Sequence, residues 1–430
     1  MPGVPSSRGC DACRQTKKKC DQLTPSCSRC ARRGLPCIGS GQRRYKFMST
    51  PDQFPFNAKG ILAHGAQAQT ESSVMKLSPR LPPSRTMQDA SNLVSALQVT
   101  DVRFELGIYG PFFAEIPRRL GRSEALDASV RALTTAYPSV HSRRFTSDMY
   151  RSYGEALRHL RRALGDPARA TSVETLCAVY LVMICQGWIG RGADFVPSHG
   201  EAMAHLLNAA VARQDWQGQF EAEVANTLLV IVLLESFGNS KIKLDPRLWT
   251  TSGPPAIARP ARPPTNGAPE IECLRVSSLA AISGYTRDIQ GSLPAIISTY
   301  QALQTDLANM KALLSGMSAV ELTLAQRRIH VRRLTGYGTL LLLGMMANWA
   351  LSVYGIGDPR ALELERAMLV DEVVELAQQA AQYRPLGSGA VPGFIMAAKA
   401  MTSDVGKLER MQELLLEYQS DFPLSNWAPG

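Results

Sequence analysis

Most of the chain shows a hydrophobic pattern with the period of an α-helix. From about Asp89 onward, apolar residues recur at intervals of three and four, which places them on one face of a helix. Alternation with a period of two is not sustained anywhere in this region, so strands are not expected. The pattern predicts helices over residues 89–106, 124–137, 145–164, 171–187, 197–213, 217–238, 274–284, 292–315, 319–354, 359–383 and 391–419. We therefore expect residues 89–430 to form a large all-α domain.

One of the predicted helices contains a long uncharged stretch. Residues 336–357 include no Asp, Glu, Lys or Arg over 22 positions, which is long enough to span a bilayer. Five glycines and Asn348 dilute the apolar character of this stretch. We therefore favour a buried core helix over a membrane span, and we expect no membrane partner.

Two proline-rich segments interrupt the chain. Residues 49–88 contain five prolines and no sustained heptad repeat of a coiled coil. We expect them to form a flexible linker between a module at residues 1–48 and the helical domain. Residues 252–270 contain six prolines and are expected to form a surface loop within the helical domain.

The positive charge of the chain is concentrated in its first residues. The formal net charge of the whole chain is +10. Residues 1–48 hold eleven of the 47 Lys and Arg residues and two of the 37 Asp and Glu residues, which leaves the other 382 residues at +1. A basic segment attached to a nearly neutral domain is typical of a module that binds a polyanion.

Six of the nine cysteines lie in this basic segment, in two copies of C-x2-C-x6-C that are offset by 17 residues: Cys10, Cys13, Cys20, Cys27, Cys30 and Cys37. A structural zinc ion takes four ligands, so six thiolates hold two Zn²⁺ ions only if two sulfurs are shared. The repeat makes Cys10 and Cys27, the first cysteine of each copy, the expected bridging pair. We therefore expect two Zn²⁺ ions per chain.

Other uses of these cysteines are less consistent with the sequence. A disulfide framework would need an oxidising compartment, and no apolar segment of a secretory signal is present at the start of the chain. A redox-active C-x2-C pair would need a βαβ context, for which the segment is too short and polar. About forty residues with few apolar side chains also need a metal to fold at all.

Residues 10–37 resemble the fungal Zn(2)-Cys(6) binuclear cluster DNA-binding domain. The resemblance rests on the cysteine spacing and on the local sequence CDACRQTKKKCDQLTPSCSRC, with Arg14 directly after the second cysteine and Pro25 two residues before the fourth. In that family the first and fourth cysteines bridge the two metal ions. Family members usually have Arg or Lys at the position of Thr16. The threonine therefore removes one expected phosphate contact here.

The resemblance also implies how the module contacts double-stranded DNA. Two short helices are expected, over about Cys13–Cys20 and Cys30–Gly34, with the first in the major groove. Lys17 is the best candidate for contacting bases, with Lys18 beside it, and the implied target is a CGG-type triplet. The remaining basic residues are expected to bind phosphates: Arg14, Lys19, Arg29, Arg32 and Arg33.

These features predict a nuclear, sequence-specific transcription regulator rather than an enzyme. No P-loop, nucleophile elbow or H-E-x-x-H motif is present in the sequence. The alternatives are a zinc-stabilised module for RNA or protein binding and, less favoured, a helical enzyme with a basic appendage. Residues 1–44 contain no Phe, Trp or Tyr for stacking on RNA bases.

The sequence leaves the mode of action open. The protein either forms a homodimer through its C-terminal domain or binds DNA as a monomer, and it either activates or represses through the transcription machinery. Regulators similar to this one often control fungal biosynthetic gene clusters, including those of secondary metabolism.

Overall fold

The computed structural model describes residues 9–23, 26–35, 37, 84–190, 199–213, 216, 218–250, 269–317 and 322–423. The chain divides into two compact units, Met1–Ser78 and Pro79–Gly430. We call the described part of the first unit the head (residues 9–37) and that of the second the body (residues 84–423). Most of the predicted linker, and nearly all of the predicted proline-rich loop at 252–270, lie outside the described residues.

The head contains two short helices, α1 (Asp11–Gln15) and α2 (Ser28–Arg33). The prediction of a first helix over Cys13–Cys20 is wrong, because the chain turns into the left-handed region at Lys17, where φ is 50°. The second helix begins two residues earlier than predicted. It ends at Gly34, whose φ of 61° is readily adopted by glycine.

The body consists of helices, and no strand occurs among its described residues, so the predicted all-α architecture is confirmed. The α-helices are α3 (Arg85–Leu97), α4 (Glu124–Ser142), α5 (Ser147–Leu164), α6 (Val173–Ile189), α7 (His199–Arg213), α8 (Gln219–Ser236), α9 (Val276–Tyr285), α10 (Leu293–Ser315), α11 (Leu324–Val353), α12 (Pro359–Ala380), α13 (Val391–Lys399) and α14 (Val405–Gln419). The 3-10 helices are η1 (Leu106–Tyr109), η2 (Pro111–Arg119), η3 (Pro246–Leu248), η4 (Glu272–Leu274) and η5 (Ala381–Tyr383).

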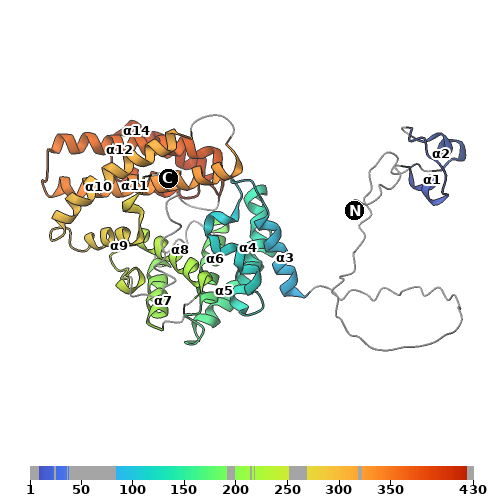
Figure 1. The fold of residues 1–430 in the computed structure, drawn as a ribbon, viewed down its shortest axis with the longest axis horizontal. Helices are drawn as coiled ribbons and strands as arrows, with labels where there is room; N and C mark the ends of the chain where they lie inside the picture. Colours follow the sequence, from blue (N-terminus) through green and yellow to red (C-terminus); the bar gives the residue numbers. More distant parts are fainter. Residues whose placement is uncertain are drawn as a thin grey trace, which may run out of the picture. The chain divides into compact units, whose positions relative to one another are not determined.

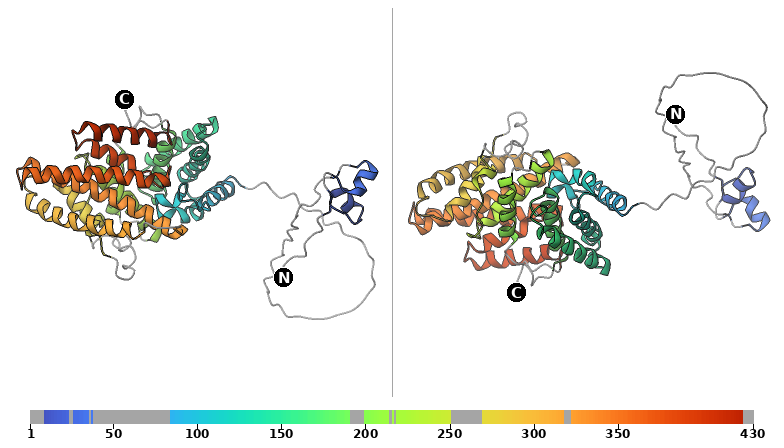
Figure 2. Two further views of the ribbon diagram at one scale, coloured as in Figure 1. Left: turned by 90° about the horizontal axis from the view of Figure 1, so that it is seen from above. Right: turned by 90° about the horizontal axis from the view of Figure 1, so that it is seen from below.

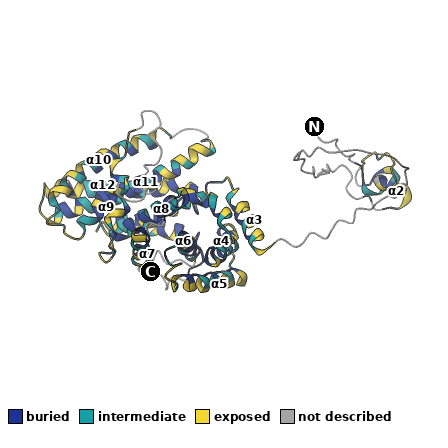
Figure 3. Cartoon of the chain, turned by 60° about the horizontal axis from the view of Figure 1, so that its bottom comes forward, coloured by how far each residue is buried: buried dark blue, intermediate teal, exposed yellow. Residues whose placement is uncertain are grey.

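These helices form two groups around one large hydrophobic core, with a smaller buried cluster between α10, α11 and α12. In the first group α4 packs against α3, α5 and α6, and α8 packs against α6 and α7. In the second group α11 lies between α10 and α12, and α13 contacts α11, α12 and α14 (Figures 1 and 2). Buried residues follow the inner helices, whereas the outer face of α5 is exposed (Figure 3).

Several helix boundaries differ from the prediction because local capping decides them. The helix α3 spans Arg85–Leu97 rather than 89–106, since the Ser84 side chain accepts a hydrogen bond from the Met87 N–H at 3.2 Å. The predicted helix 391–419 is two helices, because Asp404 caps α14 by accepting a hydrogen bond from the Lys407 N–H at 3.0 Å. The helical domain therefore begins inside the predicted linker.

The uncharged stretch at 336–357 lies mainly in α11. Among the described helices, α11 is long and apolar enough to cross a membrane by length and composition, and 61% of its most apolar window is buried. Leu340 and Leu341 are fully buried in the core of the body. The helix α11 therefore lies in the core of the body, as predicted.

Candidate zinc cluster and nucleic-acid interface

The fold of the head brings all six of its cysteines into one cluster. Two groups of four sulfur atoms form, and within each group the sulfurs lie within 4.8 Å of one another. One group contains Cys10, Cys13, Cys20 and Cys27, and the other contains Cys10, Cys27, Cys30 and Cys37. The two groups share Cys10 and Cys27, so the cluster is two four-sulfur sites joined along one edge.

The 17-residue repeat of the sequence is also a repeat of hydrogen bonds. The Cys10 N–H donates to the Cys20 sulfur at 3.5 Å, and the Cys27 N–H donates to the Cys37 sulfur at 3.3 Å. The Lys18 N–H reaches the Cys13 carbonyl at 2.9 Å, and the Leu35 N–H reaches the Cys30 carbonyl at 3.1 Å. Each copy of the motif therefore holds its three sulfurs with the same backbone geometry.

The distances between sulfurs match those of zinc coordination. A tetrahedron with metal–sulfur bonds of about 2.3 Å has edges of about 3.8 Å. The Cys10 and Cys27 sulfurs are 3.8 Å apart, and so are those of Cys13 and Cys27. The Cys10 and Cys30 sulfurs are 3.5 Å apart, and all six cysteines are free of disulfides. The six side chains thus provide the donor set that two Zn²⁺ ions require.

The thiols of the cluster differ in acidity. Burial raises the pKa of Cys13 to about 12, so this thiol is protonated at neutral pH without a nearby cation. The hydrogen bond from the Cys10 N–H lowers the pKa of Cys20 to about 7. A zinc ion deprotonates a thiol that coordinates it, so loading of this cluster releases protons.

The three consecutive lysines of the head lie on its surface. Lys17, Lys18 and Lys19 are exposed, and the structure gives their ammonium groups no ion pair within the described residues. The left-handed backbone at Lys17 directs the chain away from the end of α1. Lys17 stands where the second copy of the repeat has Gly34, which has the same left-handed conformation.

The other predicted phosphate ligands lie mainly on α2. Arg32 and Arg33 are exposed on its last turn, and Arg29 is half-buried. The Arg32 Nε donates to the Ser28 carbonyl at 3.4 Å. The side chain of Arg14 lies outside the part that the structure describes.

Sequence analysis missed the role of Asp21. Its carboxylate accepts hydrogen bonds from the Ser28 N–H at 3.2 Å, at the start of α2. Hydrogen bonds from the side chain and the backbone of Ser28 hold the pKa of Asp21 below its usual value. Asp21 therefore fixes the second half of the motif to the segment that follows Cys20. The acidic residue directly after the third cysteine can be read from the sequence. The sequence does not show that its partner is Ser28.

Comparison with known proteins supports the assignment of the head. The fungal Zn(2)-Cys(6) binuclear cluster domain matches residues 8–46. The chain is 51% identical over 37 residues to the transcriptional regulator alnR of Emericella nidulans. This similarity covers 9% of each chain, so the chain spans less than a tenth of that relative. No solved structure matches the chain significantly.

The geometry and the comparison agree on the donor set. The matched segment contains all six clustered cysteines and the three exposed lysines. Six thiols in two edge-sharing groups of four are the arrangement that a binuclear zinc cluster needs. Residues 8–46 therefore belong to the fungal Zn(2)-Cys(6) binuclear cluster family, and the cluster that they form binds two zinc ions.

Proposed function

We propose that this chain is a fungal transcription regulator that acts in the nucleus and binds double-stranded DNA through its head. The observation that carries the proposal is the six-cysteine cluster with an exposed lysine run shortly after α1. The family match at residues 8–46 supports DNA binding as the role of this segment. In this proposal the protein regulates transcription and is not an enzyme.

The proposed metal ligands are the six cysteines, with Cys10 and Cys27 bridging the two ions. Their membership of both four-sulfur groups supports this assignment. Six thiolates and two Zn²⁺ ions give the cluster a charge of −2, which the surrounding Lys and Arg residues outweigh. The surface that faces DNA is therefore positive despite the anionic cluster.

Lys17 and Lys18 are the proposed base-reading residues, and the proposed target is a CGG-type triplet. An exposed ammonium group can donate to the O6 and N7 atoms of guanine in the major groove. The proposed phosphate contacts are those that position the head without selecting sequence: Arg14, Lys19, Arg29, Arg32 and Arg33. Removing one phosphate contact should weaken binding to all duplexes equally.

The proposal also covers the oligomeric state and the target genes. A triplet is too short to specify a genomic site, so two heads on one homodimer would supply two half-sites. The body is the proposed dimerisation region, and it would also contact the transcription machinery. A biosynthetic gene cluster, such as one for a secondary metabolite, is the proposed target.

The test is a binding titration of the zinc-loaded, full-length chain. We expect a CGG-containing duplex to bind at least about tenfold more tightly than a scrambled duplex of equal composition. Lys17→Gln should reduce this difference, whereas Arg33→Gln should weaken binding to both duplexes by the same factor. Equal affinity of the unmodified chain for the two duplexes would overturn the proposed specificity.

A further inference from the structure

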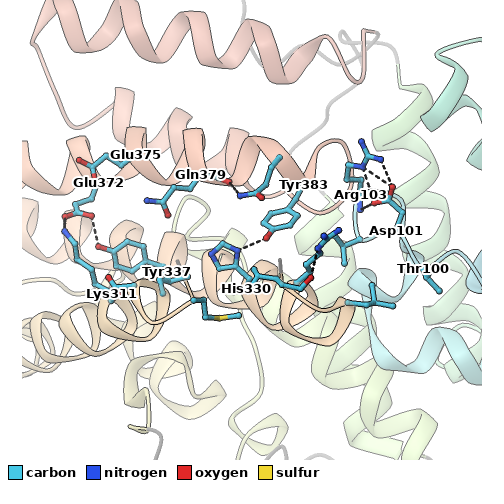
Figure 4. A pocket seen from close by; sticks show the side chains of 18 residues that line it. Thr100, Asp101, Arg103, Lys311, His330, Tyr337, Glu372, Glu375, Gln379 and Tyr383 are labelled. Atoms are coloured by element: carbon cyan, nitrogen blue, oxygen red, sulfur yellow. Dashed lines mark hydrogen bonds and ion pairs between the residues drawn. The ribbon is translucent and has the colours of Figure 1, made fainter. Parts of the chain in front are cut away.

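A large cavity in the body lies between its carboxyl-terminal helices and the turn that follows α3. Its volume is about 1270 Å³. The walls come from α10, α11, α12 and η5, and residues 100–103 line one end (Figure 4). Ligand pockets in proteins typically have volumes of about 300–1,000 Å³, so this cavity has room for an extended molecule.

The walls of the cavity are polar although they belong to neighbouring helices of one core. Glu372, Glu375 and Gln379 line it from one face of α12 at helical spacing. His330 and Tyr337 line it from the facing side of α11. Facing helices normally bury apolar side chains against each other. Glu375 and Gln379 are exposed, so the cavity is open to solvent and its lining suits a polar molecule.

The two ends of the cavity carry opposite charge. At one end Lys311 forms an ion pair with Glu372, and Glu375 has no ion pair among the described residues, which leaves this end at −1. At the other end Arg103 pairs with Asp101 at 2.7 Å, and Arg327 adds a further positive charge, which leaves that end at +1. The labelled members of each group lie at opposite sides of Figure 4.

The pKa values of two lining residues reflect the nearby charges of Arg327 and Glu375. Hydrogen bonds from Arg103 lower the pKa of Asp101, and the charge of Arg327 lowers it further. Burial raises the pKa of Tyr337, and the hydrogen bond to Glu372 and the charges of Glu372 and Glu375 raise it further. Arg327 therefore belongs to the positive end, and Glu375 belongs to the negative end.

The middle of the cavity offers neutral hydrogen-bonding groups in fixed positions. The Tyr383 hydroxyl and His330 Nδ1 are 2.7 Å apart, and Tyr383 is 3% exposed. Burial lowers the pKa of His330, which favours the neutral ring. The Tyr337 hydroxyl donates to Glu372 at 2.9 Å, which holds that carboxylate in place. The site is therefore preorganised for polar groups between two charged ends.

The separation of the ends sets the length of the ligand. Arg327 and Tyr337 are ten positions apart on α11, which corresponds to about 15 Å along the helix axis, and the Tyr337 hydroxyl donates to Glu372 at the negative end. Four residues of an extended peptide span about 13–14 Å. A single amino acid carries its two charges only a few ångströms apart and cannot reach both ends.

We propose that this cavity binds a zwitterionic, peptide-like molecule about four residues long, with its carboxylate at Arg327 and its ammonium group at Glu375. The backbone amides of such a molecule would lie beside His330, Tyr383 and Gln379. This site lies wholly in the body, so the proposal does not depend on what the head binds.

The test is calorimetric unfolding of the full-length chain with a random tetrapeptide mixture at millimolar concentration. Ligands that bind the folded state raise its unfolding temperature. We expect free-ended tetrapeptides to raise the unfolding temperature of the body by about 2 °C or more. The same mixture with acetylated and amidated ends should give less than half of this shift, and so should free alanine.

Variants locate the effect. Arg327→Gln and Glu375→Gln should each remove most of the shift caused by the free-ended mixture. The matched controls are Arg158→Gln and Glu363→Gln, two exposed charges on α5 and α12 that do not line the cavity. The controls should keep the full shift. No shift with free-ended peptides, or an equal shift with capped peptides, would overturn the proposal.

Discussion

Lys17 combines two properties that a substitution can separate. Its backbone lies in the left-handed region, with φ of 50°, and its side chain is the proposed base contact. A non-glycine residue pays about 1 kcal/mol or more for this backbone conformation, whereas glycine does not. We therefore expect Lys17→Gly to hold zinc at least as tightly as the unmodified chain, yet to bind a CGG duplex about 5- to 150-fold more weakly.

Lys17→Ala is the matched control for this experiment, because it removes the side chain without relieving the backbone. Zinc affinity is measured by competition with a chromogenic chelator, and DNA affinity by fluorescence anisotropy. Equal CGG binding by Lys17→Gly and the unmodified chain would show that Lys17 is not the base-reading residue.

The shared edge of the cluster predicts that two cysteines differ from the other four. Cys27→Ser should disturb both metal sites, because Cys27 belongs to both four-sulfur groups. Cys37→Ser should disturb one site only, since Cys37 belongs to a single group. The zinc content of each purified variant, measured by elemental analysis, tests this. One retained zinc ion per chain in Cys27→Ser would contradict a bridging role.

For individual residues of the head, the sequence predicted the metal ligands better than the backbone conformation. The spacing of six cysteines determines their donor set, because zinc coordination constrains which thiols meet. The left-handed turn at Lys17 was missed because lysine gives no sign of it. Aligning the two copies of the motif places Lys17 opposite Gly34, and that glycine was the available signal.

Among the elements, the existence of each long helix was predictable, but its ends were less so. The apolar period identified α10 at 292–315, within one residue of Leu293–Ser315. The predicted end of α4 at 137 stopped before Pro138, yet the helix continues to Ser142. Tertiary packing decides such cases, since Val140 is buried in the core and stabilises the last turn.

A close approach between α11 and α13 predicts an unusual response to a small substitution. Gly338 lies in α11, and a Cβ atom there would clash with the ring of Phe394. Phe394 is 7% exposed, so its ring cannot move aside into solvent. Although alanine is favoured over glycine in a helix by about 1 kcal/mol, we expect Gly338→Ala to lower the free energy of unfolding by about 1–3 kcal/mol.

Gly154→Ala in α5 is the control, because no atom lies within 4 Å of the added Cβ atom. This variant should raise the free energy of unfolding by up to about 1 kcal/mol. Chemical denaturation followed by circular dichroism measures both values. A stabilising Gly338→Ala would show that the two helices have room to separate.

For the whole molecule, the cavity of the body shows what a hydrophobic pattern cannot predict. Its lining combines residues 100–103 with side chains of α10, α11, α12 and η5, which are up to 283 positions apart in the chain. Each of these polar residues lies on the polar side of its own pattern and is expected to face solvent. Only the packing of the helices brings them around one space.

The division into two units predicts that metal removal affects the head alone. The body is held by a continuous hydrophobic core, and its three cysteines are buried, with the pKa of Cys273 raised by burial to about 12. Among the described residues, none of these three cysteines belongs to a cluster of potential metal ligands. We therefore expect 1,10-phenanthroline to abolish DNA binding by the full-length chain while leaving its helical circular dichroism signal and the unfolding temperature of the body unchanged. The head contributes little to that signal, because α1 and α2 have 5 and 6 residues.

Adding zinc back after chelation should restore DNA binding. A fall in the unfolding temperature of the body on chelation would instead mean that the metal stabilises both units.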